Sequence, residues 1–314
     1  MILLTGAAGY VGSHLAFKLI KSKIPFIGID NFSTKNQYNK IYYKINNVDI
    51  GDKKKILEII NRYKIKDVIH AAAYSYPVES EIKKIKYKKN NYLKTIDFID
   101  CFKGKNLSSF IFLSSSNVYS EKKSAIYKEN DNTQSKNLYG KYKFKIERYL
   151  KKKNFFKKVV ILRMFNIAGY DPELRYKIHK SKFQRLITII FKSIQKNKKF
   201  DLNFYYKNGK LMSPKRDFIF IGELNKIIIR IFKNKKIFNR YSVYNIGSNN
   251  PISLIQLVEK IEKIMKKKIF FNKKIINTSE MNNTCASVKK IEKKLSIKIY
   301  PKLTNIILSS INKF

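Results

Sequence analysis

The sequence contains no tryptophan and only two cysteines, Cys101 and Cys285, which lie far apart in the chain. Two such cysteines form no disulfide framework and match no metal-binding spacing, so we expect neither feature. The three histidines, His14, His70 and His179, are not spaced like metal ligands either. The sequence therefore points away from disulfide-stabilised secreted proteins and from metalloproteins.

Long hydrophobic runs are also missing. No apolar stretch approaches the roughly 20 residues that a membrane-spanning helix needs, although hydrophobic residues make up 44% of the chain. Because residues 1–4 already have the pattern of a buried strand, we expect no signal peptide. We therefore expect a cytoplasmic protein that does not bind membranes.

Acidic residues are few. There are 22 of them against 67 basic residues, so the formal charge is +45 at pH 7, which favours contact with polyanions. Arginine, the usual reader of bases, provides only eight of the basic residues, and lysines are scattered along the chain. Lysine, asparagine and isoleucine are encoded by AT-rich codons, so genome composition explains the bias. We expect no dedicated nucleic-acid binding and an electric field that attracts anionic ligands.

The first half of the chain alternates strand-like and helix-like segments. The expected strands cover residues 1–4, 25–29, 67–70, 110–113 and 159–163, and the expected helices cover 14–20, 54–63, 91–102 and 139–152. Regular alternation predicts an α/β fold with a doubly wound parallel sheet and helices on both faces. In such a fold, ligands bind at the carboxyl ends of the strands.

The second half of the chain is less regular. Its expected helices cover residues 183–196, 223–233 and 254–266, and its expected strands lie near 217–220 and 242–246. We find no internal repeat and no long linker, so we predict a sheet domain with a smaller capping domain. We assign residues 1–166 to the sheet domain, with a returning segment near 217–247. Residues 167–216 and 248–314 are assigned to a smaller α/β substrate-binding domain.

A glycine-rich stretch, Thr5 to Gly12, joins the first expected strand to the first expected helix. Gly6, Gly9 and Gly12 permit a tight turn and a close approach to a ligand's diphosphate, and the next helix offers N–H groups to phosphates. The following strand leads into Asp30, whose carboxylate can accept hydrogen bonds from both adenosine ribose hydroxyls and would repel a 2′-phosphate. This order predicts a Rossmann-type unit that prefers NAD to NADP.

A second group of residues carries reaction chemistry. Tyr139 and Lys143 are four residues apart on an expected helix and share one of its faces, while Ser115 follows the expected strand 110–113. Lys143 and the positive charge of an oxidised nicotinamide would lower the pKa of the Tyr139 phenol from about 10, which suits a general base. In a chain with 21 tyrosines such a pair alone would read as a solvated helix face. The prediction therefore depends on the serines and the glycine loop.

With these motifs the sequence resembles the extended short-chain dehydrogenase/reductase superfamily, that is, the NAD-dependent epimerase/dehydratase family. In particular it is similar to the UDP-glucose 4-epimerases, also called UDP-galactose 4-epimerases. The resemblance covers nearly the whole chain, and the stretch Phe165 to Gly169 is among its more specific parts. Other matching stretches are Asp30-Asn31, Val48 to Ile50, Val68 to Ala73, Val78 to Ser80, Asn90-Asn91, Ser114 to Tyr119, Arg216 to Ile219 and Tyr244 to Gly247.

The resemblance implies a role for each matching residue. Ser115 and Tyr139 would contact the 4-hydroxyl of a sugar, and Lys143 would hold the nicotinamide ribose. Asn166 and Arg216 would bind the sugar nucleotide, and a guanidinium suits its diphosphate. The implied NAD contacts are Gly6, Gly9, Tyr10, Val11, Gly12, Asp30, Asn31, Asp49, Ile50, Ala71, Ala72, Asn91, Tyr139, Lys143 and Phe165.

The implied activity is redox-neutral epimerisation at C4 of a UDP-sugar. The Tyr139 phenolate would remove the proton of the 4-hydroxyl, and tightly held NAD would take the C4 hydride and return it to the other face. The resemblance also implies a homodimer formed through a helix pair of the sheet domain. The high positive charge should oppose self-association at low salt.

Three departures from the family pattern fall on the substrate side. The second diphosphate-binding arginine of the family is missing, because residues 277–279 read Asn-Thr-Ser. Ser75 stands where a basic residue often follows the alanines 71–73, and Phe204-Tyr205 stands where a Phe-Gly is usual. The fold prediction is unaffected, whereas the identity of the sugar is left open.

Several alternatives therefore remain at this point: a uronate epimerase, a 2-acetamido-sugar epimerase, a reductase that releases NADH, or a catalytically silent NAD-binding protein. A 4,6-dehydratase is disfavoured. It typically needs an acid and a base at the positions of Ser116 and Asn117, and neither residue can donate and accept protons in that way.

Overall fold

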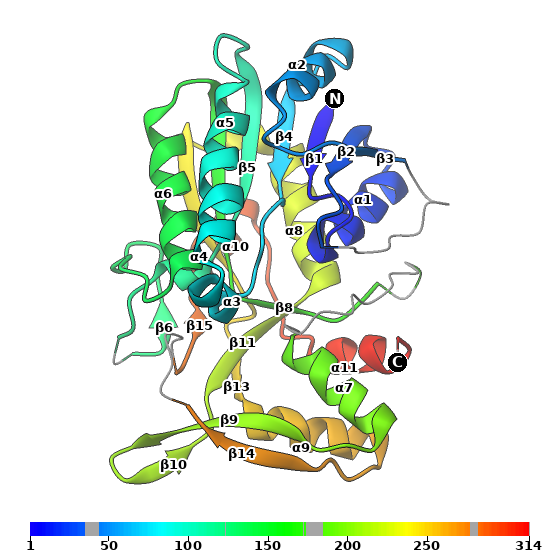
Figure 1. Ribbon diagram of the computed structural model, residues 1–314, viewed down its shortest axis with the longest axis vertical. Helices are drawn as coiled ribbons and strands as arrows, with labels where there is room; N and C mark the ends of the chain where they lie inside the picture. The colour runs from blue at the N-terminus through cyan, green and yellow to red at the C-terminus, as the bar shows by residue number, and fades with distance from the viewer. Residues whose placement is uncertain (35–43, 123, 172, 174–184, 277–281, 314) are drawn as a thin grey trace.

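Seven parallel strands form the centre of the computed structural model, which describes residues 1–34, 44–122, 124–171, 173, 185–276 and 282–313. The strand order is β12-β7-β5-β4-β1-β2-β3 (Figure 1). The strands are β1 (Ile2–Thr5), β2 (Phe26–Asp30), β3 (Ile45–Asn47), β4 (Asp67–His70), β5 (Leu107–Ser115), β7 (Phe156–Met164) and β12 (Tyr241–Ile246). This sheet confirms the predicted α/β fold. The order reverses between β1 and β4, and such a switch point is where doubly wound sheets bind ligands.

Helices cover both faces of this sheet, as predicted. One face carries α1 (Tyr10–Lys21), α8 (Ile221–Lys233) and α10 (Lys289–Leu295), and the other carries α2 (Lys53–Arg62), α5 (Lys94–Asp100) and α6 (Leu138–Lys152). Successive residues of a strand point to opposite faces. In β1, Leu4 packs in the first of these two cores and Leu3 in the second, which is why the strand is apolar throughout.

A smaller part of the molecule lies below the central sheet in Figure 1. It contains α7 (Leu186–Lys196), α9 (Leu254–Met265), α11 (Leu303–Ile311) and two three-stranded sheets, β13-β11-β8 and β10-β9-β14. Their strands are β8 (Asn166–Ala168), β9 (Phe200–Lys207), β10 (Lys210–Met212), β11 (Lys215–Phe220), β13 (Pro251–Ser253) and β14 (Phe271–Ile275). A third core, which includes Ile190, Leu257 and Ile306, holds these elements together.

Short elements complete the fold. They are α3 (Pro77–Ile82), α4 (Lys84–Tyr87), a π-helical turn (Lys88–Leu93), 3₁₀ turns at Ser116–Val118 and Lys235–Ile237, and β6 (Ile126–Tyr127), which pairs with β15 (Cys285–Ala286). Cys101 and Cys285 are buried free thiols. Within the described residues, no helix has the length and apolar character needed to cross a membrane.

Each strand and helix expected from the sequence is present, with ends shifted by a few residues. Two differ in detail. The expected helix 91–102 begins as the π-helical turn, and the expected helix 183–196 begins at Leu186, with residues 183 and 184 outside the described part. Strand β12 joins the central sheet from the second half of the chain. The assignment of 1–166, with the segment near 217–247, to one domain and of 167–216 and 248–314 to another stays a prediction.

Candidate active site

The glycine loop turns so tightly between β1 and α1 that its backbone atoms are in close contact. Gly6 has a φ of 66°, and a Cβ on it would lie 2.7 Å from the backbone nitrogen of Ala72. A Cβ on Gly12 would lie 2.0 Å from the carbonyl oxygen of Gly6. Glycine is therefore required at both positions. The bare loop and the start of α1 form a cradle that fits the diphosphate of a dinucleotide.

Asp30 ends β2 beside this loop. Its carboxylate accepts hydrogen bonds from the backbone N–H groups of Ala8 (3.0 Å) and Phe32 (2.8 Å). Burial raises the pKa of Asp30, and these backbone hydrogen bonds oppose the rise. The carboxylate is thus fixed at the edge of the loop, next to the place where the sequence prediction puts the adenosine ribose.

Two residues that the resemblance implied as cofactor contacts, Asp49 and Asn91, are not among the described residues that line the cleft. Asp49 accepts a hydrogen bond from Asn31 (2.7 Å) and pairs with Lys94 (2.6 Å). The side chain of Asn91 donates to the carbonyl oxygen of Tyr74 (2.8 Å) and accepts from its N–H (2.9 Å). In the structure they orient Asn31 and Tyr74, which do line the cleft.

The start of α6 is pressed against the loop that follows β5. Asn137 caps α6 by accepting from the N–H of Gly140 (2.9 Å), and its amide donates to the side chain of Asn117 (3.0 Å). A Cβ on Gly140 would lie 2.0 Å from the carbonyl oxygen of Asn117, so a side chain would force the helix away. This close contact places Tyr139 in the same cleft as Ser115 at the end of β5.

Lys143 lies one turn further along α6 and is almost completely buried. Its ammonium group donates to the carbonyl oxygen of Leu113 (2.7 Å) and lies 6.0 Å from the centroid of the Tyr139 ring. Burial lowers the pKa of Lys143 to about 7, and the negative charge of Glu147 opposes this effect. Tyr139 and Lys143 thus share a helix face and a cleft, as predicted.

The expectation that Lys143 lowers the pKa of Tyr139 is wrong for the protein alone. Burial raises the pKa of Tyr139, and only a hydrogen bond with Ser115 and the charge of Arg185 lower it among the described residues. The physical reason is that the burial which brings the two side chains together disfavours both charged forms. The positive charge that the sequence assigned to Lys143 comes from Arg185 instead.

A buried ion pair and its hydrogen bonds connect β5 and α6, which carry Ser115, Tyr139 and Lys143. Arg163 on β7 donates to Glu147 on α6 through Nε (3.2 Å) and Nη2 (2.7 Å). The hydroxyl of Ser114 on β5 donates to the same carboxylate (2.5 Å). Because Ser114 precedes Ser115 and Glu147 lies one turn beyond Lys143, this network fixes the two strand ends and the helix relative to one another.

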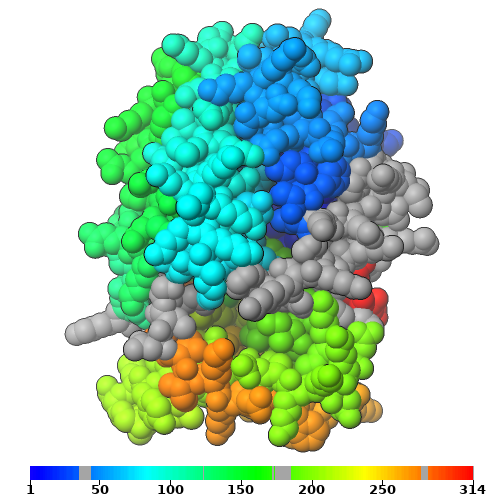
Figure 2. All heavy atoms as spheres, viewed as in Figure 1, coloured from blue at the N-terminus to red at the C-terminus, as the bar shows by residue number. Residues whose placement is uncertain are grey.

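Most of the predicted site residues surround one cleft with a volume of about 1320 Å³. Ligand pockets commonly measure about 300–1000 Å³, so this cleft has room for a dinucleotide and a second ligand. In Figure 2 the blue and cyan residues of the first half lie above the green and orange residues of the smaller part, and both groups contribute to the wall. The predicted site residues that line it are Gly6, Gly9, Tyr10, Val11, Gly12, Asp30, Asn31, Ile50, Ala71, Ala72, Ser115, Tyr139, Lys143, Phe165, Asn166 and Arg216.

The side of the cleft to which the sequence assigns the substrate includes residues of β8 and β11. Asn166 on β8 pairs in parallel register with Phe218 on β11. Arg216 lies just before Phe218 on β11. The Arg216 guanidinium donates to the carbonyl oxygen of Asn282 (2.8 Å). Residues 277–279, where the family's second arginine would stand, lie outside the described part.

Sequence reasoning missed several charged residues that line the cleft, and Arg185 is the most notable because its guanidinium carbon lies 4.0 Å from the centroid of the Tyr10 ring. No motif surrounds it. The available signal was its rarity, since it is one of eight arginines, but it falls inside the expected helix 183–196. Two residues that depart from the family pattern can be placed in the structure. Ser75 is exposed and lines the cleft, and the Tyr205 hydroxyl accepts a hydrogen bond from Asn283 (3.0 Å).

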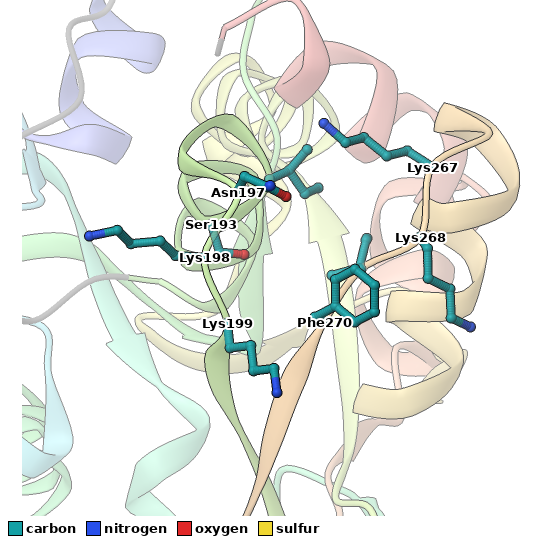
Figure 3. Close-up of a pocket in the computed structure, with 9 residues that line it drawn as sticks. Ser193, Asn197, Lys198, Lys199, Lys267, Lys268 and Phe270 are labelled. Atoms are coloured by element: carbon teal, nitrogen blue, oxygen red, sulfur yellow. The ribbon is translucent and has the colours of Figure 1, made fainter.

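A second, smaller pocket of about 190 Å³ lies between the end of α7 and the segment after α9. Four lysines line it, namely Lys198, Lys199, Lys267 and Lys268. Figure 3 shows that their ammonium groups point in different directions. They therefore do not converge on one ligand, and the large cleft is the candidate active site.

Comparison with known proteins agrees with this geometry. A sequence model of the NAD dependent epimerase/dehydratase family matches residues 2–247. The chain belongs to this family. Among curated relatives of this family member, the UDP-glucose 4-epimerase of Caenorhabditis elegans is 28% identical over 289 residues, which cover 84% of the chain and 82% of the relative. NAD is the cofactor on which the family depends, and the glycine cradle fits it.

Solved structures of similar fold cover nearly all of this family member. The UDP-glucose 4-epimerase from Bifidobacterium longum, solved with NAD+ and UDP, has a TM-score of 0.88 at 24% identity and matches 99% of this chain and 97% of its own. The UDP-glucuronic acid 4-epimerase from Bacillus cereus, solved with UDP-glucuronic acid and NAD, has a TM-score of 0.82 at 25% identity, with coverage of 99% and 98%. The fold is thus shared by epimerases that differ in their sugar.

Proposed function

We propose that this protein epimerises C4 of a nucleotide sugar and that UDP-glucose and UDP-galactose are its substrate pair. The observation that carries the proposal is the cleft itself. Ser115, Tyr139 and Lys143 meet in the same cleft as the glycine loop, and Arg216 lies in its wall on the substrate side. A hydride carrier, a proton acceptor and a diphosphate-binding cation are the parts that such a reaction needs.

Each site residue has a separate role in the proposed reaction. The Tyr139 hydroxyl, in its ionised form, takes the proton of the sugar's 4-hydroxyl, while Ser115 holds that hydroxyl by a hydrogen bond. Lys143 binds the nicotinamide ribose, and Asn166 and Arg216 hold the nucleotide diphosphate. When bound, NAD would supply the acceptor for the C4 hydride and the donor that returns it, so no net oxidation would occur. Turning of the keto sugar within the cleft exposes its other face.

The surroundings of Ser115 support epimerisation over dehydration. Ser116 and Asn117, which follow it, have side chains that neither gain nor lose protons near neutral pH. The Asn117 side chain is also held by Asn137 (3.0 Å). The site therefore offers no acid and base pair at the place where loss of water would need one.

A uronate epimerase is the second candidate, and the similarity to the Bacillus cereus enzyme favours it. The two candidates differ only in the group at C6 of the sugar. The homodimer that the resemblance implied stays a prediction and is not needed for either candidate.

The experiment compares kcat/KM for UDP-galactose, UDP-glucuronic acid and UDP-N-acetylgalactosamine with the protein as purified and no added NAD. We expect conversion of UDP-galactose to UDP-glucose with the highest kcat/KM of the three. A higher kcat/KM for UDP-glucuronic acid would identify the uronate as the preferred substrate and would leave the proposed C4 epimerisation intact. No conversion of any sugar, with NAD bound, would contradict the proposal. A Tyr139→Phe protein prepared in the same way controls for contaminating epimerase.

A further inference from the structure

Arg185 is the cation that lies beside the glycine loop. It is the residue just before α7, in the smaller part of the molecule, with an extended backbone (φ −72°, ψ 145°). Its guanidinium carbon lies 4.0 Å from the centroid of the Tyr10 ring. Tyr10 is the first residue of α1 and directly follows Gly9 of the loop. Arg185 and the loop both line the large cleft.

The ring beneath Arg185 is held firmly. The Tyr10 hydroxyl donates to the carbonyl oxygen of Gly169 (2.6 Å), and its ring packs edge-to-face against Tyr170. A guanidinium that lies on an aromatic ring keeps its N–H groups directed outward in its own plane, which suits bidentate binding of phosphate. Tyr10 therefore holds a phosphate-binding group next to the phosphate-binding end of α1.

The charge of Arg185 reaches from this loop to the reacting group. Burial lowers the pKa of His14 on α1, and the charge of Arg185 adds to this effect. Burial raises the pKa of Tyr139 on α6, and the charge of Arg185 opposes the rise. The guanidinium lies against Tyr10 at the start of α1 and lines the same cleft as Tyr139, in which a dinucleotide's diphosphate and ribose would be bound.

The other cations in the described wall of the cleft have contacts of their own. Lys83 and Lys86 pair with Glu79 (3.2 Å each), and Lys274 pairs with Asp201 (3.7 Å). Lys143 is bound to a backbone carbonyl, and Arg216 lies on the substrate side. The position after the alanines 71–73, where the family often has a basic residue, holds the neutral Ser75.

We propose that Arg185 binds the diphosphate of NAD, across the cleft from the glycine loop, and so supplies from the smaller part of the molecule the cation that Ser75 does not. The contact joins the two parts of the molecule through the cofactor. It depends on membership of the NAD-dependent family and not on the identity of the sugar. A failure of the substrate experiment leaves it unaffected.

The test measures binding and not turnover. Equilibrium dialysis gives the NAD dissociation constant of wild type, Arg185→Ala and Arg185→Lys. Displacement of NAD gives the constants for ADP-ribose and adenosine. A charge-assisted bidentate contact implies a loss of about ten- to hundred-fold for Arg185→Ala. ADP-ribose carries the same diphosphate, so its affinity falls by the same factor, whereas that of adenosine, which has no phosphate, is unchanged. The affinity of Arg185→Lys for NAD and for ADP-ribose is expected to lie between those of wild type and Arg185→Ala.

The matched control is Arg62→Ala. Arg62 also lies near an aromatic ring, 5.4 Å from the centroid of Tyr63, but on α2 and not among the residues that line the cleft. We expect Arg62→Ala to leave the NAD affinity unchanged. Unchanged NAD affinity in Arg185→Ala would overturn the proposal. So would weaker binding of UDP with NAD unaffected, which would move the cation to the substrate. If Arg185→Ala does not fold, by circular dichroism, Arg185→Lys decides: wild-type affinity for NAD and ADP-ribose would overturn the proposal, and a loss for both would support it.

Discussion

At the scale of single residues, two side chains with shifted pKa values, Tyr139 and Lys143, lie beside one another in this site. Burial raises the pKa of Tyr139 and lowers the pKa of Lys143 to about 7. A phenol that must ionise therefore depends on positive charge from elsewhere, which Arg185 and an oxidised nicotinamide supply. In the proposed mechanism, Tyr139 would therefore ionise only when the oxidised cofactor fills the cleft.

Replacement of Tyr139 by phenylalanine tests the assignment of the proton acceptor. Removal of a general base lowers kcat by about 10²- to 10⁴-fold, and we expect unchanged NAD affinity because the ring remains. Tyr142→Phe on the same helix is the control, since its ring stacks on Tyr92 and does not line the cleft. Substantial turnover by Tyr139→Phe in a steady-state assay would refute the assignment.

The depressed pKa of Lys143 predicts a pH dependence of stability. The folded protein loses this proton near pH 7, while the unfolded chain keeps it until its ordinary pKa of 10.5. Since the unfolded state binds more protons between these values, stability rises with pH across this window. The slope from one such group is at most about 1.4 kcal/mol per pH unit.

Urea unfolding at several pH values from 7 to 9 measures this slope. Lys143→Met removes the contribution of Lys143, so its stability rises less steeply than that of wild type. Lys141→Met, at an exposed position of the same helix, keeps the wild-type slope. Equal slopes for wild type and Lys143→Met would show that Lys143 remains charged in the folded protein.

At the scale of elements, close backbone contacts position the site. Gly12 against Gly6 shapes the cofactor cradle, and Gly140 against Asn117 seats α6 at the end of β5. Both contacts hold because a glycine occupies the point of closest approach, and both lie at ends of elements where the sheet presents ligands. The chemistry is therefore placed by a few backbone approaches and not by the bulk of the core.

Gly12→Ala tests the first of these contacts. The new Cβ would overlap the Gly6 carbonyl, so we expect the unfolding free energy to fall by about 1–3 kcal/mol and NAD retention after gel filtration to be lost. Gly104→Ala is the comparison, because it has a positive φ of 74° but open space around it. It should cost about 1–2 kcal/mol from strain alone and leave NAD binding intact. Normal retention by Gly12→Ala would contradict the role of the cradle.

Six of the seven central strands could be predicted from the sequence because each contains a short apolar run, and each long helix has its own periodic pattern. Strand β3, with the sequence Ile-Asn-Asn, has no such run and was missed. The glycine loop and the pair Tyr139 and Lys143 could be found because their spacing is local, and Ser115 could be found because it follows an apolar strand. Strands such as β14, with the exposed sequence Phe271–Ile275 rich in lysine, carry no such pattern and pair with β9 only in the folded chain. Arg185 was missed for the same reason, since only the packing of the smaller part brings it to Tyr10.

At the scale of the whole molecule, the positive charge and the cleft act together. A formal charge of +45 surrounds a cleft whose expected ligands are both anionic. Such a field raises the rate at which anions enter and works against association of identical chains. The charge is thus expected to favour ligand capture and to make any homodimer sensitive to salt.

This expectation gives a prediction for self-association. Screening shortens the range of repulsion, so the dimer fraction in sedimentation equilibrium should rise between about 20 mM and about 500 mM salt. A fixed amount of protein and a buffer without phosphate keep other effects constant. A dimer that dissociates as salt increases would show that opposite charges, and not an apolar contact, hold the subunits together.

The central claim is that the cleft moves one hydride from C4 of a nucleotide sugar and puts the same hydride back. The most direct measurement uses UDP-galactose with deuterium at C4, incubated with the purified protein in ordinary water without added NAD. Mass spectrometry and NMR of the product follow the label. The account predicts UDP-glucose with deuterium retained at C4. Loss of deuterium to water, or conversion that accumulates deuterated NADH, would contradict it.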